Sequence, residues 1–133
     1  MHYVSSHDTE SLTASLKSWG YNVVTLDGSK VRDKASLMTQ AAADLPAFDE
    51  VRPTSWAGFN DALGSMFFAF DESKIALVWT STNTILESGL ADFVIAGDVV
   101  TTNARRGVEH GVKFHVFFVG DGLNFPAWMP DPI

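Results

Sequence analysis

The sequence contains no cysteine and few basic residues. Without cysteine the chain has no disulfides, no thiolate metal ligands and no cysteine nucleophile. Nine lysines and arginines stand against 16 aspartates and glutamates, which gives a formal net charge of -7. A chain with this charge repels polyanions, so nucleic acid and anionic membrane surfaces are excluded as direct partners. The composition favours a cationic protein as the partner.

Segments for targeting or membrane insertion are also missing. The first residues, "MHYVSSHDTE", lack the basic and apolar regions of a signal peptide, and no apolar run approaches the roughly 20 residues of a membrane span. We therefore expect a cytoplasmic protein. The length of 133 residues, 46% of them hydrophobic, suits one core, so residues 1–133 are expected to form a single domain that is a monomer when free.

The residue patterns of common enzymes and cofactor sites are absent too. The sequence has no phosphate-binding GxxxxGK or GxGxxG loop and no GxSxG nucleophile motif. His110 and His115 are five residues apart, a spacing at which neither a helix nor a strand brings two ligands together, and a metal site needs roughly three or four ligands. We expect no catalytic residue, no cofactor and no metal, and therefore a protein that is not an enzyme.

Hydrophobic patterning predicts an α/β fold. Helices are expected over residues 9–19, 34–45 and 55–68, followed by a helical region over 84–111 that Gly89, Gly97 and Gly107 divide into two helices. Strands are expected in "YNVVTLDGSK", "KIALVWTST" and "VKFHVFFVGDG". Strands separated by helices imply right-handed crossovers, so a small three-stranded parallel sheet packed with helices is predicted. The last residues, 121–133, are expected to lie as an extended tail over apolar surface.

The helix predicted in "SWAGFNDALGSMFF" has an unusual outer face. At about 100° per residue its apolar residues share one sector. That sector holds Trp56, Phe59, Asn60, Leu63, Met66 and Phe67, while Ala57, Gly58, Asp61, Ala62 and Ser65 fall opposite and Gly64 lies at the boundary. A glycine inside a helix costs about 1 kcal/mol relative to alanine, so two of them need a reason. Either another molecule approaches this face closely, or neighbouring elements of the same domain pack against the glycines.

Asp61 is the one carboxylate on this face of small residues, where a basic group of a partner can reach it. The surrounding residues 44–73 are strongly acidic, because their acidic residues face a single base, Arg52. Those acidic residues are Asp44, Asp49, Glu50, Asp61, Asp71 and Glu72. An electronegative surface of this kind speeds the encounter with a cationic partner.

The segment "VVTLDGSKVRDKASLMTQAAADLP", followed by "SWAGFNDALGSM" and "ALVW", resembles the barstar family of intracellular ribonuclease inhibitors. The similarity covers residues 20–120, with residues 1–19 as an N-terminal helical extension and residues 121–133 as the tail. It implies a three-stranded parallel sheet with helices, and a helix and preceding loop that enter the active site of a ribonuclease toxin. There an aspartate takes the place of the substrate phosphate, and matching the apolar positions puts Asp61 on that aspartate.

The resemblance implies a partner-binding surface on this helix and its loop. The residues are Asp61, Asn60, Ala57, Gly58, Gly64 and Ser65 on the helix, with Asp49 and Glu50 in the loop. The sequence departs from the family where Ala57 replaces a second acid, Asn60 replaces an aromatic, and Arg106 stands close to a further acidic position. Arg105 and Arg106 also form the one basic pair in the sequence, late in a helix, where cations interact favourably with the helix dipole.

Two other functions compete with this interpretation. A barstar-like protein-binding module could serve a partner that is not a ribonuclease, and it would then not compete with RNA for that partner. A small enzyme could use Asp61 as a general base, which requires a pocket that perturbs its pKa and further polar groups beside it.

Overall fold

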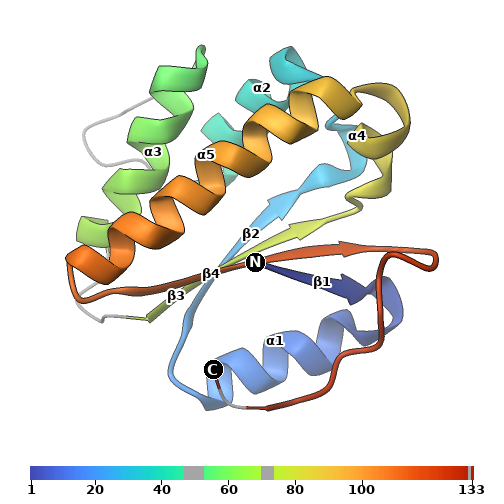
Figure 1. The fold of residues 1–133 in the computed structure, drawn as a ribbon, viewed down its shortest axis with the longest axis vertical. Helices are drawn as coiled ribbons and strands as arrows, with labels where there is room; N and C mark the ends of the chain where they lie inside the picture. Colours follow the sequence, from blue (N-terminus) through green and yellow to red (C-terminus); the bar gives the residue numbers. More distant parts are fainter. Residues whose placement is uncertain (47–52, 70–73, 132) are drawn as a thin grey trace.

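The structure, a computed structural model, describes residues 1–46, 53–69, 74–131 and 133 (Figure 1). The elements in chain order are β1 (His2–Ser5), a 3₁₀ helix (Ser6–Asp8), α1 (Thr9–Ser18), β2 (Asn22–Asp27), a 3₁₀ helix (Gly28–Lys30), α2 (Lys34–Asp44), α3 (Trp56–Ala69), β3 (Lys74–Thr80), α4 (Asn83–Ser88), α5 (Leu90–Glu109) and β4 (Lys113–Gly120). No helix in these ranges is both long enough and apolar enough to cross a lipid bilayer.

The strands of the described residues form one parallel sheet in the order β1-β4-β3-β2. The α/β class and the parallel sheet are confirmed, but the prediction of three strands is one too few. The missing strand is β1, which pairs with β4 at the edge of the sheet and places Tyr3 opposite Phe118. The N-terminal residues 1–19 are therefore a strand and a helix rather than a helical extension alone. Only Val4 of β1 is buried, so the strand has no apolar pattern that would reveal it.

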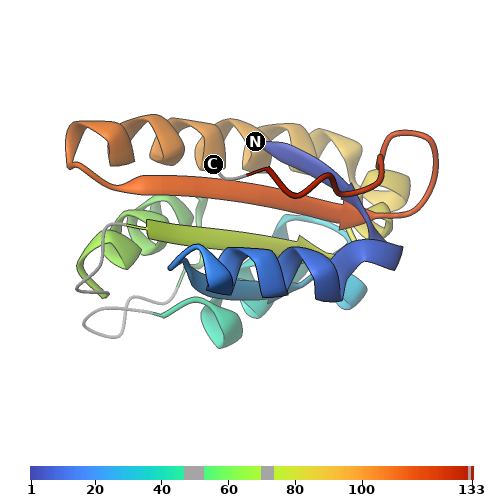
Figure 2. The same ribbon diagram turned by 90° about the horizontal axis from the view of Figure 1, so that it is seen from below.

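Helices cover both faces of the sheet, as Figures 1 and 2 show from two directions: α2, α3, α4 and α5 lie on one face and α1 lies on the other. The side chains of β3 alternate between these two cores. Leu77 and Trp79 pack with the four helices, whereas Ala76 and Val78 pack with α1. Burial on both faces explains why the sequence of this strand is continuously apolar.

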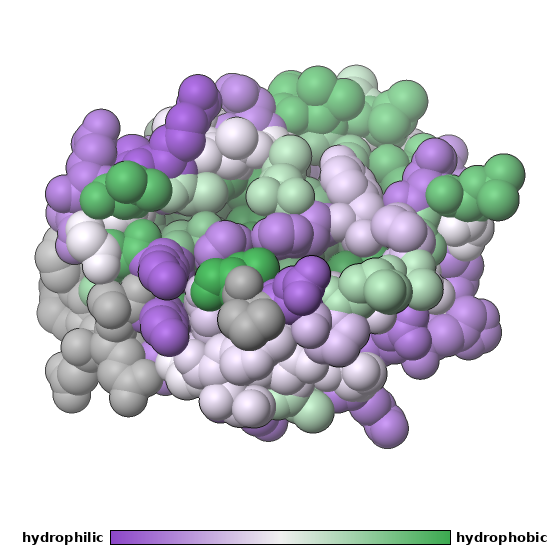
Figure 3. All heavy atoms as spheres, turned by 60° about the horizontal axis from the view of Figure 1, so that its bottom comes forward, coloured by the Kyte–Doolittle hydropathy of each residue, from purple (hydrophilic) through white to green (hydrophobic). Residues whose placement is uncertain are grey.

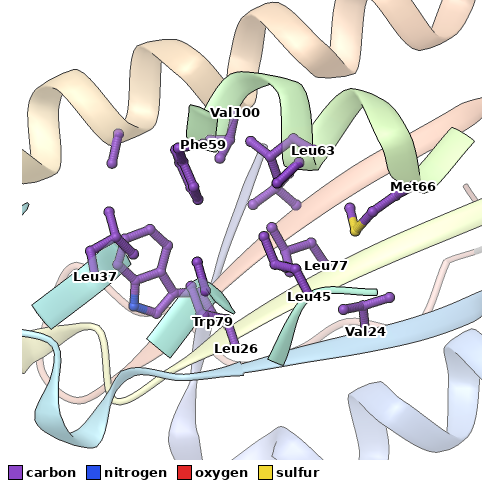
Figure 4. Close-up of a cluster of buried hydrophobic side chains, with 14 of the residues drawn as sticks. Val24, Leu26, Leu37, Leu45, Phe59, Leu63, Met66, Leu77, Trp79 and Val100 are labelled. Carbon is purple, nitrogen blue, oxygen red and sulfur yellow. The ribbon is translucent and has the colours of Figure 1, made fainter. Parts of the chain in front are cut away.

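The larger core fixes α3 on the sheet. In Figure 4, Phe59, Leu63 and Met66 point from α3 toward Leu77 and the other buried side chains of the sheet. All three α3 side chains are completely buried. Removing a side chain of this size from a packed core destabilises a protein by about 2–5 kcal/mol, so these contacts hold the helix firmly in place.

The second core includes the C-terminal segment. Trp128 packs edge-on against Phe117 of β4 with ring centroids 5.8 Å apart, and the hydroxyl of Tyr21 donates a hydrogen bond to the carbonyl of Ile133 (2.9 Å). The amide of Ser5 donates to the carbonyl of Pro126 (2.8 Å), which ties the segment to β1. These contacts hold the C-terminal segment against the second core, although residues 121–125 form turns before the chain becomes extended. Figure 3 shows the surface with the lower side of Figure 1 turned forward. Mostly hydrophilic or near-neutral side chains cover the lower part of that view, and the hydrophobic groups form separate patches.

Two helix boundaries agree with the sequence and two expected interruptions do not occur. Asp33 caps α2 in a capping box, in which its carboxylate accepts from the amide of Ser36 (2.9 Å), and Gly89 separates α4 from α5. Gly97 and Gly107, expected to break the helical region, both lie inside α5. At Gly107 an added Cβ would approach the carbonyl of Val112 to 3.0 Å. The glycine therefore permits the segment that follows α5 to pack closely against the helix.

Candidate functional site

Ser55 lies directly before α3 and caps its first turn. The hydroxyl of Ser55 accepts a hydrogen bond from the amide of Gly58 (3.1 Å), and its carbonyl accepts from Phe59 (2.9 Å). A serine in this position satisfies amides that have no partner within the helix. The cap and the buried Phe59 together fix the first turn, from which Ala57 is exposed.

Asp61 is exposed on the outer side of α3, one turn after Ala57 and one turn before Ser65. The hydroxyl of Ser65 donates to the main-chain carbonyl of Asp61 (2.8 Å) and not to its carboxylate. Within the described part of the chain the carboxylate of Asp61 receives no hydrogen bond, so it is free to meet another molecule. Ala62, expected on this outer face, is completely buried, because the packed sector of α3 is one residue wider than the sequence suggested.

Both glycines of α3 pack against their own chain. A Cβ on Gly58 would lie 3.3 Å from Cα of Pro53, and a Cβ on Gly64 would lie 3.7 Å from Oδ1 of Asn103 and 3.9 Å from the guanidinium of Arg106. Of the two explanations that the sequence left open, a close neighbour within the same chain accounts for Gly58, whereas the contacts at Gly64 are of ordinary van der Waals length and leave room for a Cβ. Each glycine remains partly exposed, and because it has no side chain, nothing protrudes from the outer surface of α3 at that position.

A polar contact joins α3 to α5 beside this surface. Asn103 of α5 is completely buried, and its Nδ2 donates to Oδ1 of Asn60 (2.8 Å) and to the carbonyl of Val99 (3.0 Å). Its Oδ1 accepts from Nη1 of Arg106 at 3.5 Å. Asn60, predicted as a partner-binding residue, therefore uses its amide oxygen to position α5. The asparagines place Arg106 next to α3.

A hollow of about 290 Å³ lies between α3 and the C-terminal end of α5, which run side by side in Figure 1. It is lined by Asp61, Gly64, Ser65, Phe67, Arg106 and His110. Phe67, Arg106 and His110 extend the site beyond the sequence prediction. One signal for Arg106 and His110 was available, because their spacing of four residues places both on one side of a helix.

The hollow carries charges of both signs. Asp61 supplies a carboxylate from α3, and Arg106 supplies a guanidinium from α5, yet these two residues form no ion pair with each other. His110 is held by a contact of 2.9 Å between its Nδ1 and the carbonyl of Arg106. The arrangement suits recognition of another macromolecule that brings its own charges to this surface.

The acidic residues near α3 in the sequence differ in their surroundings. Asp44 is structural, because its Oδ2 accepts from the amide of Asp27 and from the side chain of Gln40, both at 2.8 Å. Asp49 and Glu50 of the predicted partner-binding loop lie outside the described residues, as do Asp71 and Glu72.

The two histidines of the last strand region lie in different places. His110 lines the hollow, whereas Nδ1 of His115 lies 3.2 Å from Nε2 of His2. Burial, the charged N-terminus and His115 lower the pKa of His2 to about 4, and burial, the N-terminus and Lys113 lower the pKa of His115. Both imidazoles are therefore neutral near pH 7. Over the described ranges, no three side chains of His, Asp or Glu come together as metal ligands.

A comparison with models of protein families shows to which family the chain belongs. A family model described as Barstar (barnase inhibitor) matches residues 21–119, which is well over half of the chain. The chain belongs to the barstar family. Membership implies a function like that of a ribonuclease inhibitor, exerted on a protein partner, since members of the barstar family are inhibitors and not enzymes. A search of the curated proteins found no match.

The barstar-family match includes α3, α5 and the hollow between them, and leaves out β1, α1 and the C-terminal segment. Its bounds differ by one residue at each end from the 20–120 expected for the barstar-like core. The structure shows where the three residues that depart from the barstar pattern lie. Ala57 is exposed on the outer side of α3, Asn60 faces α5, and Arg106 stands at the hollow.

Proposed function

We propose that this barstar-family chain inhibits a ribonuclease by covering its active site with the outer surface of α3, with Asp61 at the centre. One observation carries the proposal. Asp61 is an exposed carboxylate on a helix and accepts no hydrogen bond from the rest of the described chain. Matching the apolar positions of α3 to the family pattern supports its assignment as the phosphate-mimicking aspartate. A residue in this state contributes little to the fold, so its value lies in what it can bind.

The mechanism is occlusion by charge and shape. A ribonuclease active site gathers cationic side chains that bind the phosphate of RNA, and a carboxylate presented to them replaces that phosphate. Phe59, Leu63 and Met66 anchor α3 from below, so little conformational freedom is lost when the partner binds. The chain then acts by binding alone and needs no catalytic residue, cofactor or metal.

The rest of the surface permits close approach. Ala57, Gly58, Gly64 and Ser65 surround Asp61 with small side chains, so the main chain of α3 can enter a cleft. Asp49 and Glu50, in the loop before α3, are proposed to add negative charge that steers a cationic partner. Asn60 contributes by fixing α5.

The N- and C-terminal parts are proposed to lie outside this interface. The helix α1 and the C-terminal segment cover the face of the sheet opposite to α3 (Figures 1 and 2). We retain the proposal of a single domain over residues 1–133 that acts as a monomer in the cytoplasm, where it can protect cellular RNA.

The proposal is tested by affinity capture. The wild-type chain and Asp61→Arg are used to capture proteins from a lysate of the source cell, and the captured material is assayed for RNA cleavage with and without added chain. Asp98→Arg is the matched control, because Asp98 is also exposed on a helix but does not line the hollow. We expect wild type and Asp98→Arg to capture and silence a ribonuclease that Asp61→Arg does not hold.

Two results contradict the proposal. Capture of the same ribonuclease by Asp61→Arg would move the binding surface elsewhere. Capture of a partner that has no ribonuclease activity, by wild type and both variants, would favour a barstar-like binding module with another function.

A further inference from the structure

We infer that the ribonuclease bound by this chain presents a carboxylate to Arg106, beside the cationic group that meets Asp61. The inference rests on the proposed function and adds to it the charge pattern of the partner. It concerns the hollow between α3 and α5, where the two charged residues stand on opposite helices.

The position of Arg106 is set by its neighbours. Its guanidinium lies over Gly64, where a Cβ would be 3.9 Å from both Nη atoms, and Nη1 donates to Oδ1 of Asn103 at 3.5 Å. Asn103 is itself completely buried and bonded to Asn60. The arginine thus lies beside α3, over a residue without a side chain and within reach of a buried amide. An arginine placed in advance loses less freedom on binding than a mobile one.

The charge of Arg106 is still available to a partner. The side chain is exposed, and its hydrogen bond within the described part of the chain goes to a neutral amide at a long distance. No carboxylate of the described residues forms an ion pair with it. A guanidinium has several N–H donors in one plane and binds a carboxylate through two of them at once.

A wholly cationic partner surface does not fit this hollow. When an interface closes over Arg106, a cation opposite it would be repelled at short range, and an uncharged group would leave the guanidinium buried without a counter-charge. The partner therefore needs a carboxylate at this point. The hollow, at about 290 Å³, is slightly smaller than the range for small-molecule sites, about 300–1,000 Å³, and suits side chains of a protein.

The helix dipole does not explain this placement. Arg105 and Arg106 both lie in the last turns of α5, where each cation interacts with the negative end of the helix. Only Arg106 lines the hollow, and Arg105, also exposed, does not. Arg105 is consequently a matched control. It carries the same charge on the same helix and lies only one residue further from the end of α5.

The experiment measures the affinity of the purified ribonuclease for the full chain and its variants at constant ionic strength. We expect Arg106→Glu to weaken binding by on the order of 30-fold or more, as for the loss of a buried charge pair, while Arg105→Glu changes it by less than about threefold. Arg106→Lys retains part of the affinity. Thermal unfolding checks that each variant is folded.

A second arm locates the carboxylate. Acidic residues of the ribonuclease that lie near its active site are changed to lysine one at a time and tested against Arg106→Glu. One of these changes is expected to restore binding by at least about tenfold, which is the signature of a direct charge pair.

The results separate this inference from the proposed function. If Asp61→Ala weakens binding while Arg106→Glu binds as well as or better than Arg105→Glu, the partner has no carboxylate at Arg106 and the inference alone falls. If Asp61→Ala binds with unchanged affinity, the proposed site itself is wrong and the inference falls with it. If no acidic residue of the ribonuclease restores binding to Arg106→Glu, the direct pair is refuted.

Discussion

Asp61 of α3 and Arg106 of α5 line the same hollow without forming an ion pair. Two opposite charges that do not neutralise each other leave both available to a partner. The helices that carry them are fixed by buried side chains and by the contact between Asn60 and Asn103. The proposed binding surface is therefore firmly supported, and we expect that its chemistry can be changed with little effect on the fold.

Asp61→Asn tests this separation of binding from stability. The carboxylate is exposed and accepts no hydrogen bond from the described residues, so the free energy of unfolding in urea should change by less than about 0.5 kcal/mol. Affinity for the ribonuclease should fall by about 2 kcal/mol or more, a size borrowed from interface hot spots in general, barstar's own among them. A loss of several kcal/mol in stability would make Asp61 a structural residue.

The asparagine contact between α3 and α5 is expected to stabilise the fold. Asn103→Ala leaves the amide oxygen of Asn60 without its partner and opens space in a completely buried position, so it should cost about 1–3 kcal/mol in urea unfolding. Asn60→Ala and the double variant complete a mutant cycle. A coupling energy of about 0.5–1.5 kcal/mol is expected, and a value near zero would show that the two side chains act independently.

Two glycines should respond in opposite ways to alanine. Gly97 lies inside α5 with no heavy atom within 4 Å of an added Cβ, so Gly97→Ala should raise the free energy of unfolding by about 0.5–1 kcal/mol. Gly28 is buried, and an added Cβ would collide with the carbonyl of Thr80 and come within 2.7 Å of Nε1 of Trp79. Gly28→Ala should cost about 1–3 kcal/mol. Equal effects of the two changes would contradict the packing described for Gly28.

The pair of His2 and His115 predicts how stability depends on pH. The pKa of His2 in the folded chain is about 4, below the ordinary 6.5, so the unfolded chain takes up the proton first as the pH falls. The free energy of unfolding should therefore be unaffected by His2 above about pH 6.5 and should fall between pH 6.5 and 4. The pKa of His115 is lowered as well and acts in the same direction.

His2→Gln should flatten this part of the stability profile, because glutamine does not titrate. His7→Gln is the control, since His7 is an exposed histidine five residues further along the chain. Asp27 and Asp33, whose pKa values are lowered by hydrogen bonds from Ser29 and Ser36, lose their contribution only below about pH 3.8. A steeper fall in His2→Gln than in wild type between pH 6.5 and 4 would contradict the account.

The sequence was sufficient for most of the fold because its local signals agree with the packing. The hydrophobic patterning of residues 34–45, the continuous apolar run of β3 and the apolar sector of α3 each predicted the right element. Strand β1 was missed because its pairing with β4 joins residues more than 100 positions apart and only Val4 is buried. Glycine favours a break in a helix, yet α5 continues through Gly97 and Gly107, and at Gly107 the neighbouring carbonyl of Val112 leaves little room for a side chain.

The candidate site was predictable only in part. The outer face of α3 and its exposed Asp61 follow from helical periodicity, but Ala62 was misplaced because the burial of a helix depends on what flanks it. The spacing of Arg106 and His110 places both on one side of a helix, but that this side meets α3 follows only from the tertiary packing of α3 and α5. The part played by Asp49 and Glu50 stays a prediction.

The central claim, that Asp61 occupies the active site of a ribonuclease, is tested most directly by inhibition kinetics. The rate of RNA cleavage by the captured ribonuclease is measured against the concentration of wild-type chain and of Asp61→Ala at several RNA concentrations. We predict that RNA competes with the wild-type chain, so that more chain is needed as RNA rises, and that Asp61→Ala inhibits at least about 30-fold more weakly. Inhibition that does not depend on RNA concentration, or that is equally strong with Asp61→Ala, would contradict the account.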